Sequence, residues 1–202
     1  MKKKIIIALL LLIPFISIIF VILFRGVIMP SNEEIISSLK DINAYKCEVE
    51  YITKNSKGIE KEVTSQYYSK EKGVRVEYGD DLVKIYKQDN ICVKDKKNNS
   101  EINLNKEMDI VHTLAFMNTI FSYPIKADSI AEGQEEWGDV VYIQADVELY
   151  LNNIYLNKAR IFINKADKTP IGIVVYDNQG NDTMRIVYKN FEKVKNVDES
   201  MF

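Results

Sequence analysis

Apolar and polar side chains alternate along much of this chain, and that period of two constrains its fold more than any other feature. Tyr45, Cys47, Val49 and Tyr51 alternate with charged residues, which is the pattern of a half-buried β-strand. Further strand-like segments, separated by turn residues, cover residues 59–67, 74–78, 82–87, 91–93, 141–147, 159–163, 170–176 and 184–191. Short strands at this spacing predict an antiparallel meander.

Two segments with a helical period interrupt the meander. Residues 31–42 begin with a capping box, Ser31 and Glu34, and place their apolar side chains on one face. Residues 107–121 carry apolar side chains over a wide arc and predict a helix that is buried on more than one side. Because a sheet with one extended apolar face must curl or be covered, residues 31–202 are expected to form one α+β domain. Its core would be a curved antiparallel half-barrel with helices over the concave face.

The N-terminus carries a membrane signal. Residues 5–24 contain no charge and, as a helix, would span roughly 30 Å, the thickness of a bilayer's hydrocarbon core. Three lysines precede the run, so the positive-inside rule predicts a cytoplasmic tail at 1–4, a single-pass signal anchor at 5–24 and a linker at 25–30. A cleaved export signal is the alternative, although no small-x-small site follows the run. Both interpretations place the body outside the cytoplasm.

Charge and composition exclude several classes of function. The chain has a net charge of -2, but four basic residues lie before residue 31, leaving 23 basic against 29 acidic residues beyond it. That mildly acidic body argues against a nucleic-acid partner. One His and two Cys leave little for metal or triad chemistry, and no G-x-S-x-G, H-E-x-x-H or phosphate-binding loop occurs. We therefore predict no enzyme, no catalytic residue, no metal and no cofactor.

A few single side chains remain candidates for a role. His112 lies one turn after Asp109 and is interpreted as a structural or surface residue. Cys47 and Cys92 fall on opposite strand faces, which favours free thiols over a disulfide. Trp137, in the acidic stretch 132–139, is either part of a solvated loop or an interface anchor. Glu135 and Glu136 would point to opposite faces of a strand, which suits paired acid and base work poorly.

The apolar face of the sheet is the main functional candidate. It is either a packed core or a hydrophobic cavity for an acyl chain or an apolar partner. The candidate cavity residues are Tyr51, Val63, Tyr67, Val76, Tyr78, Phe116, Ile143, Ile161, Ile173 and Ile186.

Three stretches carry a resemblance to a known superfamily. They read IISSLKDINAYKCEVEY (Ile35–Tyr51), SQYYSKEKGVRVEY (Ser65–Tyr78) and KTPIGIVVYDNQGNDTMRIVYKNFEKVKNVDESMF (Lys168–Phe202). They resemble the lipoprotein carriers of LolA and LolB type and, within that superfamily, the GerS type of spore germination protein. The resemblance implies that the guanidinium of Arg75 contacts lid helices over the cavity, the alternative being an outward Arg. The lipidated Cys of GerS-type proteins is missing here.

This resemblance implies three functions. The first is a membrane-anchored accessory protein, acting outside the cytoplasm or in the spore intermembrane space, that supports a cell-wall N-acetylmuramoyl-L-alanine amidase of the spore cortex. The second is a lipid or lipoprotein carrier or acceptor, and the third is a sensor that regulates a membrane partner. Edge strands would also permit strand exchange in a homodimer.

Overall fold

The computed structural model describes residues 12–22, 30–55 and 58–202. Residues 12–22 form a helix with exposed side chains, in which the Ser17 hydroxyl donates to the Ile13 carbonyl at 2.9 Å. Outside the described residues lie the predicted tail at 1–4, residues 5–11 and 23–24 of the predicted anchor, and residues 25–29 of the predicted linker. Within the described part of the chain, no helix is both long and apolar enough to cross a bilayer.

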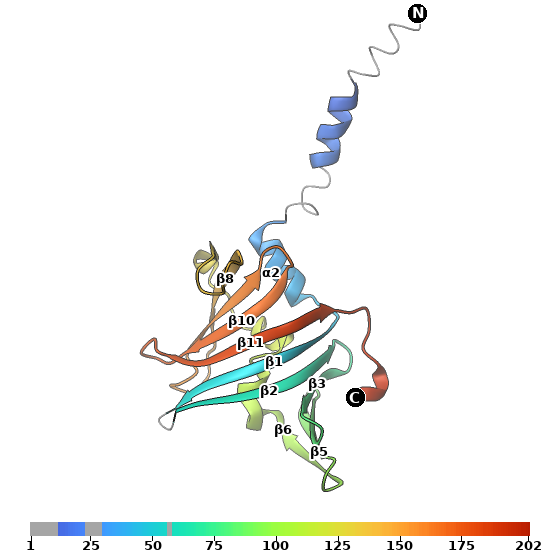
Figure 1. Cartoon of the computed structure of the whole chain (residues 1–202), viewed down its shortest axis with the longest axis vertical. Helices are drawn as coiled ribbons and strands as arrows, with labels where there is room; N and C mark the ends of the chain where they lie inside the picture. Colours follow the sequence, from blue (N-terminus) through green and yellow to red (C-terminus); the bar gives the residue numbers. More distant parts are fainter. Residues whose placement is uncertain (1–11, 23–29, 56–57) are drawn as a thin grey trace, which may run out of the picture. The chain divides into compact units, whose positions relative to one another are not determined.

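The body is built on an antiparallel sheet of eleven described strands (Figure 1). Their spatial order is β6-β5-β4-β3-β2-β1-β11-β10-β9-β8-β7, and the sheet curls so that β3 to β6 turn away from the plane of β1, β10 and β11. The strands are β1 (Ala44–Asn55), β2 (Gly58–Ser69), β3 (Gly73–Tyr78), β4 (Leu82–Tyr86), β5 (Asn90–Asp95), β6 (Ser100–Asn105), β7 (Ala131–Gly133), β8 (Tyr142–Glu148), β9 (Lys158–Asn164), β10 (Thr169–Tyr176) and β11 (Asp182–Lys193). The predicted curved antiparallel meander is confirmed.

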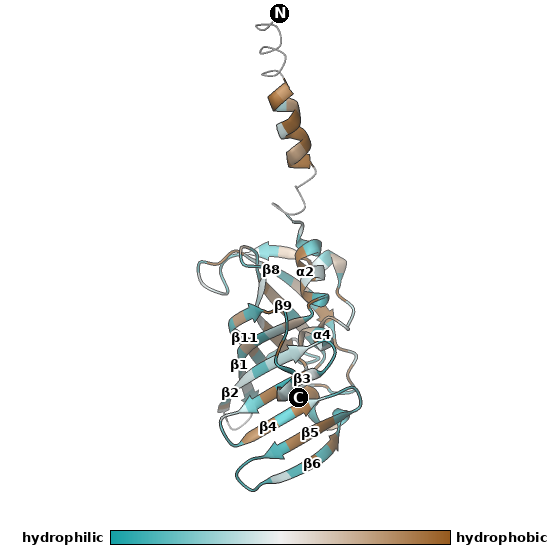
Figure 2. Ribbon diagram, turned by 90° about the vertical axis from the view of Figure 1, so that its right-hand side faces the viewer, coloured by the Kyte–Doolittle hydropathy of each residue, from teal (hydrophilic) through white to brown (hydrophobic). Residues whose placement is uncertain are grey.

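The strand order divides the sheet into two consecutive halves. Strands β1 to β6 form one meander and β7 to β11 the other, and the two meet where β1 pairs with β11. Strands β6 and β7 therefore lie at opposite edges although they are neighbours in the chain. The bridging segment, residues 106–130, has to cross the whole sheet to connect them, and it does so along one face (Figure 2). We call that face concave and the other convex.

The first predicted helix is confirmed as α2 (Asn32–Lys40). Its capping box has the expected geometry: the Ser31 amide donates to Glu34 Oε2 at 2.7 Å, and the Glu34 amide donates to Ser31 Oγ at 3.2 Å. Leu39 on the apolar face is fully buried. The sequence pattern thus located this helix and its start.

The second predicted helix, over residues 107–121, is wrong as a single element. The segment is broken into η1 (Lys106–Asp109), α3 (Ile110–Thr113) and α4 (Met117–Ile120), with η2 (Ala127–Ser129) further on. The break falls at Phe116, whose φ of -86° and ψ of 126° are extended. The Ala115 carbonyl and the Met117 amide, on the two sides of the break, form hydrogen bonds to side chains of the sheet instead of continuing a helix. Tertiary contacts therefore override the helical period here.

Strand register corrects two of the candidate cavity residues. Residues directly opposite each other in an antiparallel pair point to the same face of the sheet. Tyr51 lies opposite Glu62, on the concave face, and Val63 lies opposite Glu50, on the other face. Val63 and Tyr67 therefore point to the convex face, and Val63 is 55% exposed. The other strand candidates lie on the concave face, namely Tyr51, Val76, Tyr78, Ile143, Ile161, Ile173 and Ile186.

Candidate binding surface

The bridging segment fills the concave face of the sheet. Its side chains Leu114, Phe116, Met117 and Ile120 are at most 1% exposed, and Ile143 beneath them is fully buried. This arrangement is a close-packed core, in which side chains take the space that an acyl chain would need. The candidate cavity residues on the concave face are therefore packed in the core of this structure.

Buried polar groups of the sheet fix the middle of the bridging segment. The Tyr188 hydroxyl donates to the Ala115 carbonyl at 2.7 Å, while the Tyr45 hydroxyl accepts from the Met117 amide at 3.3 Å. Gln66 Nε2 also donates to the Tyr45 hydroxyl at 2.6 Å. A continuous helix would satisfy the Ala115 carbonyl and the Met117 amide internally. The sheet therefore holds the break in the helix in place.

Burial keeps these phenols neutral. It raises the pKa of Tyr45, Tyr51 and Tyr188 well above the ordinary value, because a buried phenolate would lose its hydration. The Tyr51 hydroxyl can accordingly donate to the His112 carbonyl at 3.3 Å. Three tyrosines from the two central strands, β1 and β11, thus hold successive parts of the segment.

A charged cluster ties the start of the bridging segment to β2 and β4. Asp109 Oδ2 accepts hydrogen bonds of 2.6 Å from Lys84 Nζ and from the Tyr86 hydroxyl. His112 Nδ1 lies 2.6 Å from Asp109 Oδ1, and His112 Nε2 lies 2.8 Å from Glu62 Oε2. His112 therefore lies between two carboxylates, one from its own segment and one from the sheet.

The cluster perturbs the pKa values of its central pair. Burial opposes the charge on Asp109, but hydrogen bonds from His112, Lys84 and Tyr86 outweigh it and hold the pKa well below its usual range. Burial also disfavours the His112 imidazolium, yet the bonds to Asp109 and Glu62 raise its pKa above the ordinary value. Both shifts therefore favour the charged forms of the pair, a carboxylate and an imidazolium. In the described ranges, no group of three His, Cys, Asp or Glu side chains is arranged to hold a metal ion.

Two adjoining pockets open beside this cluster, and we call them together the mouth groove. They share Thr53 and Val111, so one cleft runs past both. The charged pocket has a volume of about 430 Å³ and is completed by Tyr51, Glu60, Lys61, Glu62 and His112. The apolar pocket has a volume of about 470 Å³ and is completed by Lys54, Asn153, Tyr155, Leu156, Thr183 and Met184.

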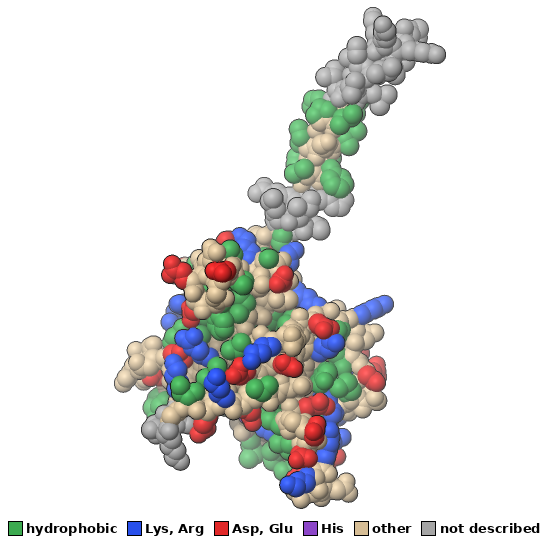
Figure 3. All heavy atoms as spheres, viewed as in Figure 1, with side chains coloured by type: hydrophobic (Ala, Val, Ile, Leu, Met, Phe, Trp, Pro, Cys, Tyr) green, Lys and Arg blue, Asp and Glu red, His purple; other side chains and the backbone are tan. Residues whose placement is uncertain are grey.

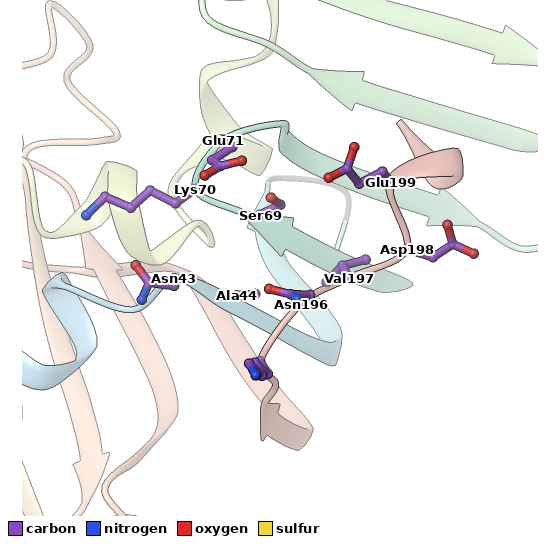
Figure 4. A pocket seen from close by; sticks show the side chains of 10 residues that line it. Asn43, Ala44, Ser69, Lys70, Glu71, Asn196, Val197, Asp198 and Glu199 are labelled. Atoms are coloured by element: carbon purple, nitrogen blue, oxygen red, sulfur yellow. The ribbon is translucent and has the colours of Figure 1, made fainter.

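A third pocket is polar and of mixed charge (Figure 4). It has a volume of about 720 Å³ and lies between the β2–β3 turn and the C-terminal tail, with Lys70 and Glu71 on the turn and Asp198 and Glu199 on the tail. Its charges of both signs favour no single class of ligand. Basic and acidic side chains are likewise interspersed over the face seen in Figure 3.

Arg75 lies on the convex face, away from the bridging segment. Its Nη1 donates to the Met201 carbonyl at 2.6 Å, and its Nη2 pairs with Glu77 Oε1 at 2.6 Å. Phe202, the next residue, packs against Val83, Ile85 and Cys92 on the same face. The guanidinium thus holds the carbonyl end of the C-terminal helix η3 (Glu199–Met201), whereas the resemblance implied a contact with lid helices over the cavity.

The remaining candidates take structural positions. The Trp137 ring is half-buried, 5.3 Å from the Phe162 ring and directly over Gly172, where an added Cβ would come within 2.5 Å of it. Cys47 and Cys92 are both buried and free, as predicted. Glu136 approaches Arg185 at 3.9 Å, an exposed contact of little energetic weight.

Sequence reasoning missed the partners of the bridging segment. Tyr45 and Tyr188 alternate like any other core position, so nothing in the pattern marked their hydroxyls as hydrogen-bonding groups. Gln66 was missed as well, because the sequence assigned Val63 and Tyr67 to the core face of this strand, whereas the fully buried Gln66 lies on the opposite face. The mouth groove was also missed, because its walls come from five separate stretches of the chain.

The topology and the covered face define a class: one open, curved antiparallel sheet crossed on its concave side by a helical segment. An uncharacterized conserved protein from Thermus thermophilus has a similar fold, with a TM-score of 0.54 at 10% identity, covering 84% of this chain and 91% of that one. Within this class the chain belongs to the family of YdcC-like sporulation proteins, whose family model matches residues 2–202. No curated protein sequence matches the chain significantly.

Two further solved structures are similar to the chain at TM-scores below 0.5. The LolA superfamily protein NE2245 from Nitrosomonas europaea has a TM-score of 0.48 at 10% identity, covering 85% of this chain and 97% of that one. The CwlD amidase from Clostridioides difficile in complex with the GerS lipoprotein gives a TM-score of 0.47 at 20% identity, covering 79% of this chain and 92% of the matched chain.

Proposed function

We propose that this chain is a membrane-anchored accessory protein without catalysis of its own, which binds and supports a cell-wall amidase during sporulation. Membership of a family of sporulation proteins supports a role during sporulation. The sequence resemblance to GerS-type proteins supports an N-acetylmuramoyl-L-alanine amidase as the partner. The uncharged run at 5–24 supports an anchor that leaves the body outside the cytoplasm.

The filled concave face is the observation that carries this proposal. A carrier needs an empty apolar cavity, whereas here Leu114, Phe116 and Met117 occupy the space between the sheet and the solvent. An acyl chain could enter this space only by displacing those buried side chains. A role at the protein surface needs no such rearrangement.

Co-purification tests the proposal directly. The full chain, extracted in detergent, is mixed with the sporulation-specific N-acetylmuramoyl-L-alanine amidase of the same organism and separated by size-exclusion chromatography. We expect a stable complex and a higher yield of amidase activity on cortex peptidoglycan than with the enzyme alone. Separate elution together with unchanged activity would refute the role.

Native mass spectrometry separates this role from that of a carrier. The detergent-extracted chain is expected to carry no stoichiometric lipid after detergent removal in the instrument. A lipid adduct that survives at one copy per chain would favour the carrier instead.

A further inference from the structure

We propose that the mouth groove binds a segment of a partner protein in which an apolar side chain is followed closely by Lys or Arg. The inference deepens the proposed function, since it rests on the partner being a protein. It concerns the side of the groove that faces solvent, and the bridging segment stays in place.

The apolar pocket supplies the first half of this specificity. Leu156 and Met184 are buried at its base, whereas Val111 and Tyr155 are 39% and 62% exposed at its walls. Large apolar side chains that stay exposed around a hollow of this kind mark an interaction site, because covering them removes apolar surface from water. A volume of about 470 Å³ accommodates an apolar side chain together with the backbone that carries it.

The charged pocket supplies the second half. The nearby lysines are committed elsewhere, since Lys61 of this pocket pairs with Glu50 at 3.6 Å and Lys54 of the apolar pocket pairs with Asp182 at 2.9 Å. The carboxylate of Glu60, by contrast, forms no ion pair or hydrogen bond with any described residue. The charge left available to a ligand is therefore negative.

The neighbouring carboxylate strengthens that preference. Glu62 lies on the same face as Glu60, is 49% exposed, and gives one oxygen to His112. Two adjacent carboxylates beside an apolar hollow attract a cationic group and repel a phosphate. A polypeptide supplies both an apolar group and a cation, whereas the headgroup of an anionic phospholipid would bring negative charge to Glu60.

Site-specific photocrosslinking tests the inference in the intact protein. A photoreactive phenylalanine replaces Tyr155 in the full-length chain in sporulating cells, and a second strain carries it at Val63, an exposed apolar position on the convex face. Crosslinked peptides are sequenced by mass spectrometry. We expect peptides from Tyr155 that place Lys or Arg within a few residues of an apolar side chain, and we expect none from Val63.

A charge reversal provides the matched comparison. Glu60→Lys is expected to reduce the crosslink yield at position 155 by about fivefold, the scale of an exposed ion pair turned into a repulsion. Glu71→Lys, an equal charge change on the exposed β2–β3 turn, is expected to leave the yield unchanged. An equal loss in both variants, or in neither, would refute the role of Glu60.

The crosslinked partner separates this inference from the proposed function. Amidase peptides of the expected composition support both, and such peptides from another protein support the groove but refute the amidase. Amidase captured only at Val63 keeps the function and overturns the groove. Crosslinks from position 155 to lipid, to a second copy of this chain or to acidic segments, or none at all, also overturn it.

Discussion

The hydroxyl of Tyr188 on β11 donates a 2.7 Å hydrogen bond to the carbonyl of Ala115, which lies 73 residues earlier in the chain. Both groups are buried. In a continuous helix, this carbonyl would accept a hydrogen bond from within the helix. Here it accepts one from the last strand, which links that strand to the bridging segment.

Replacing this hydroxyl should destabilise the fold. Tyr188→Phe leaves the buried Ala115 carbonyl with only a long 3.5 Å hydrogen bond from Gln66 Nε2, and we expect the free energy of unfolding to fall by about 1–3 kcal/mol, as for a poorly paired buried acceptor. Urea denaturation measures the change. Tyr150→Phe, at a side chain that is 76% exposed, is the control and should leave the midpoint unchanged.

The charged cluster makes stability depend on pH. The pKa of His112 is raised in the folded state, so its stabilisation is complete below the unfolded value of about 6.5 and is lost as pH rises through the folded pKa. We therefore expect the stability difference between the native chain and His112→Asn to be larger at about pH 6 than at about pH 9. A difference that grows with pH would contradict the ion pair.

Asp109 makes the stability of the fold depend on pH in the acidic range. Its lowered pKa stabilises the fold above the unfolded value of about 3.9, and that stabilisation is lost as pH falls toward the folded pKa. Asp109→Asn should therefore cost stability at neutral pH and less in strong acid. Urea midpoints at a series of pH values measure this.

The single His allows its pKa to be measured directly. Glu62→Gln removes one of the two carboxylates beside the imidazole, so the pKa of His112 should fall. Proton NMR titration of the one imidazole signal reads this value without assignment. Glu60→Gln removes a charge from the neighbouring groove wall and is the matched control, so it should lower the pKa of His112 less. Equal shifts in the two variants would show that His112 responds to the total charge of the groove and not to its contact with Glu62.

The single Trp reports on the convex face. An added Cβ at Gly172 would lie 2.5 Å from the Trp137 ring and 2.8 Å from the Ile186 carbonyl. Gly172→Ala should displace the indole into water, shift its fluorescence to the red and cost about 1–3 kcal/mol. Gly180→Asn, which adds a side chain in open space, should leave the emission unchanged.

How far the sequence predicts this fold depends on burial. The strands that bury an apolar face were predicted close to their observed bounds, and the capping box at Ser31 located α2. The edge strands β6 and β7 were missed because they bury almost nothing and so carry no apolar alternation. Val63 and Tyr67 were assigned to the wrong face because alternation alone does not say which set of side chains faces the core.

The binding surface was less predictable than the sheet. Its features depend on pairs distant in sequence, such as Glu62 with His112 or Thr53 beside Val111, and no local pattern encodes them. The break at Phe116 was hidden for the same reason, since the groups that stabilise it come from the sheet.

The pairing of β1 with β11 also has a consequence for the order of folding. Within each half, every strand pairs with its neighbour in the chain, so those contacts close only short loops. The central pair, with Tyr51 opposite Ile186, closes a loop that contains nearly the whole domain, and such closure is slow because its entropic cost comes before its gain. We expect two hairpin arrays to form early and the seam between them to close last, trapping the bridging segment beneath it.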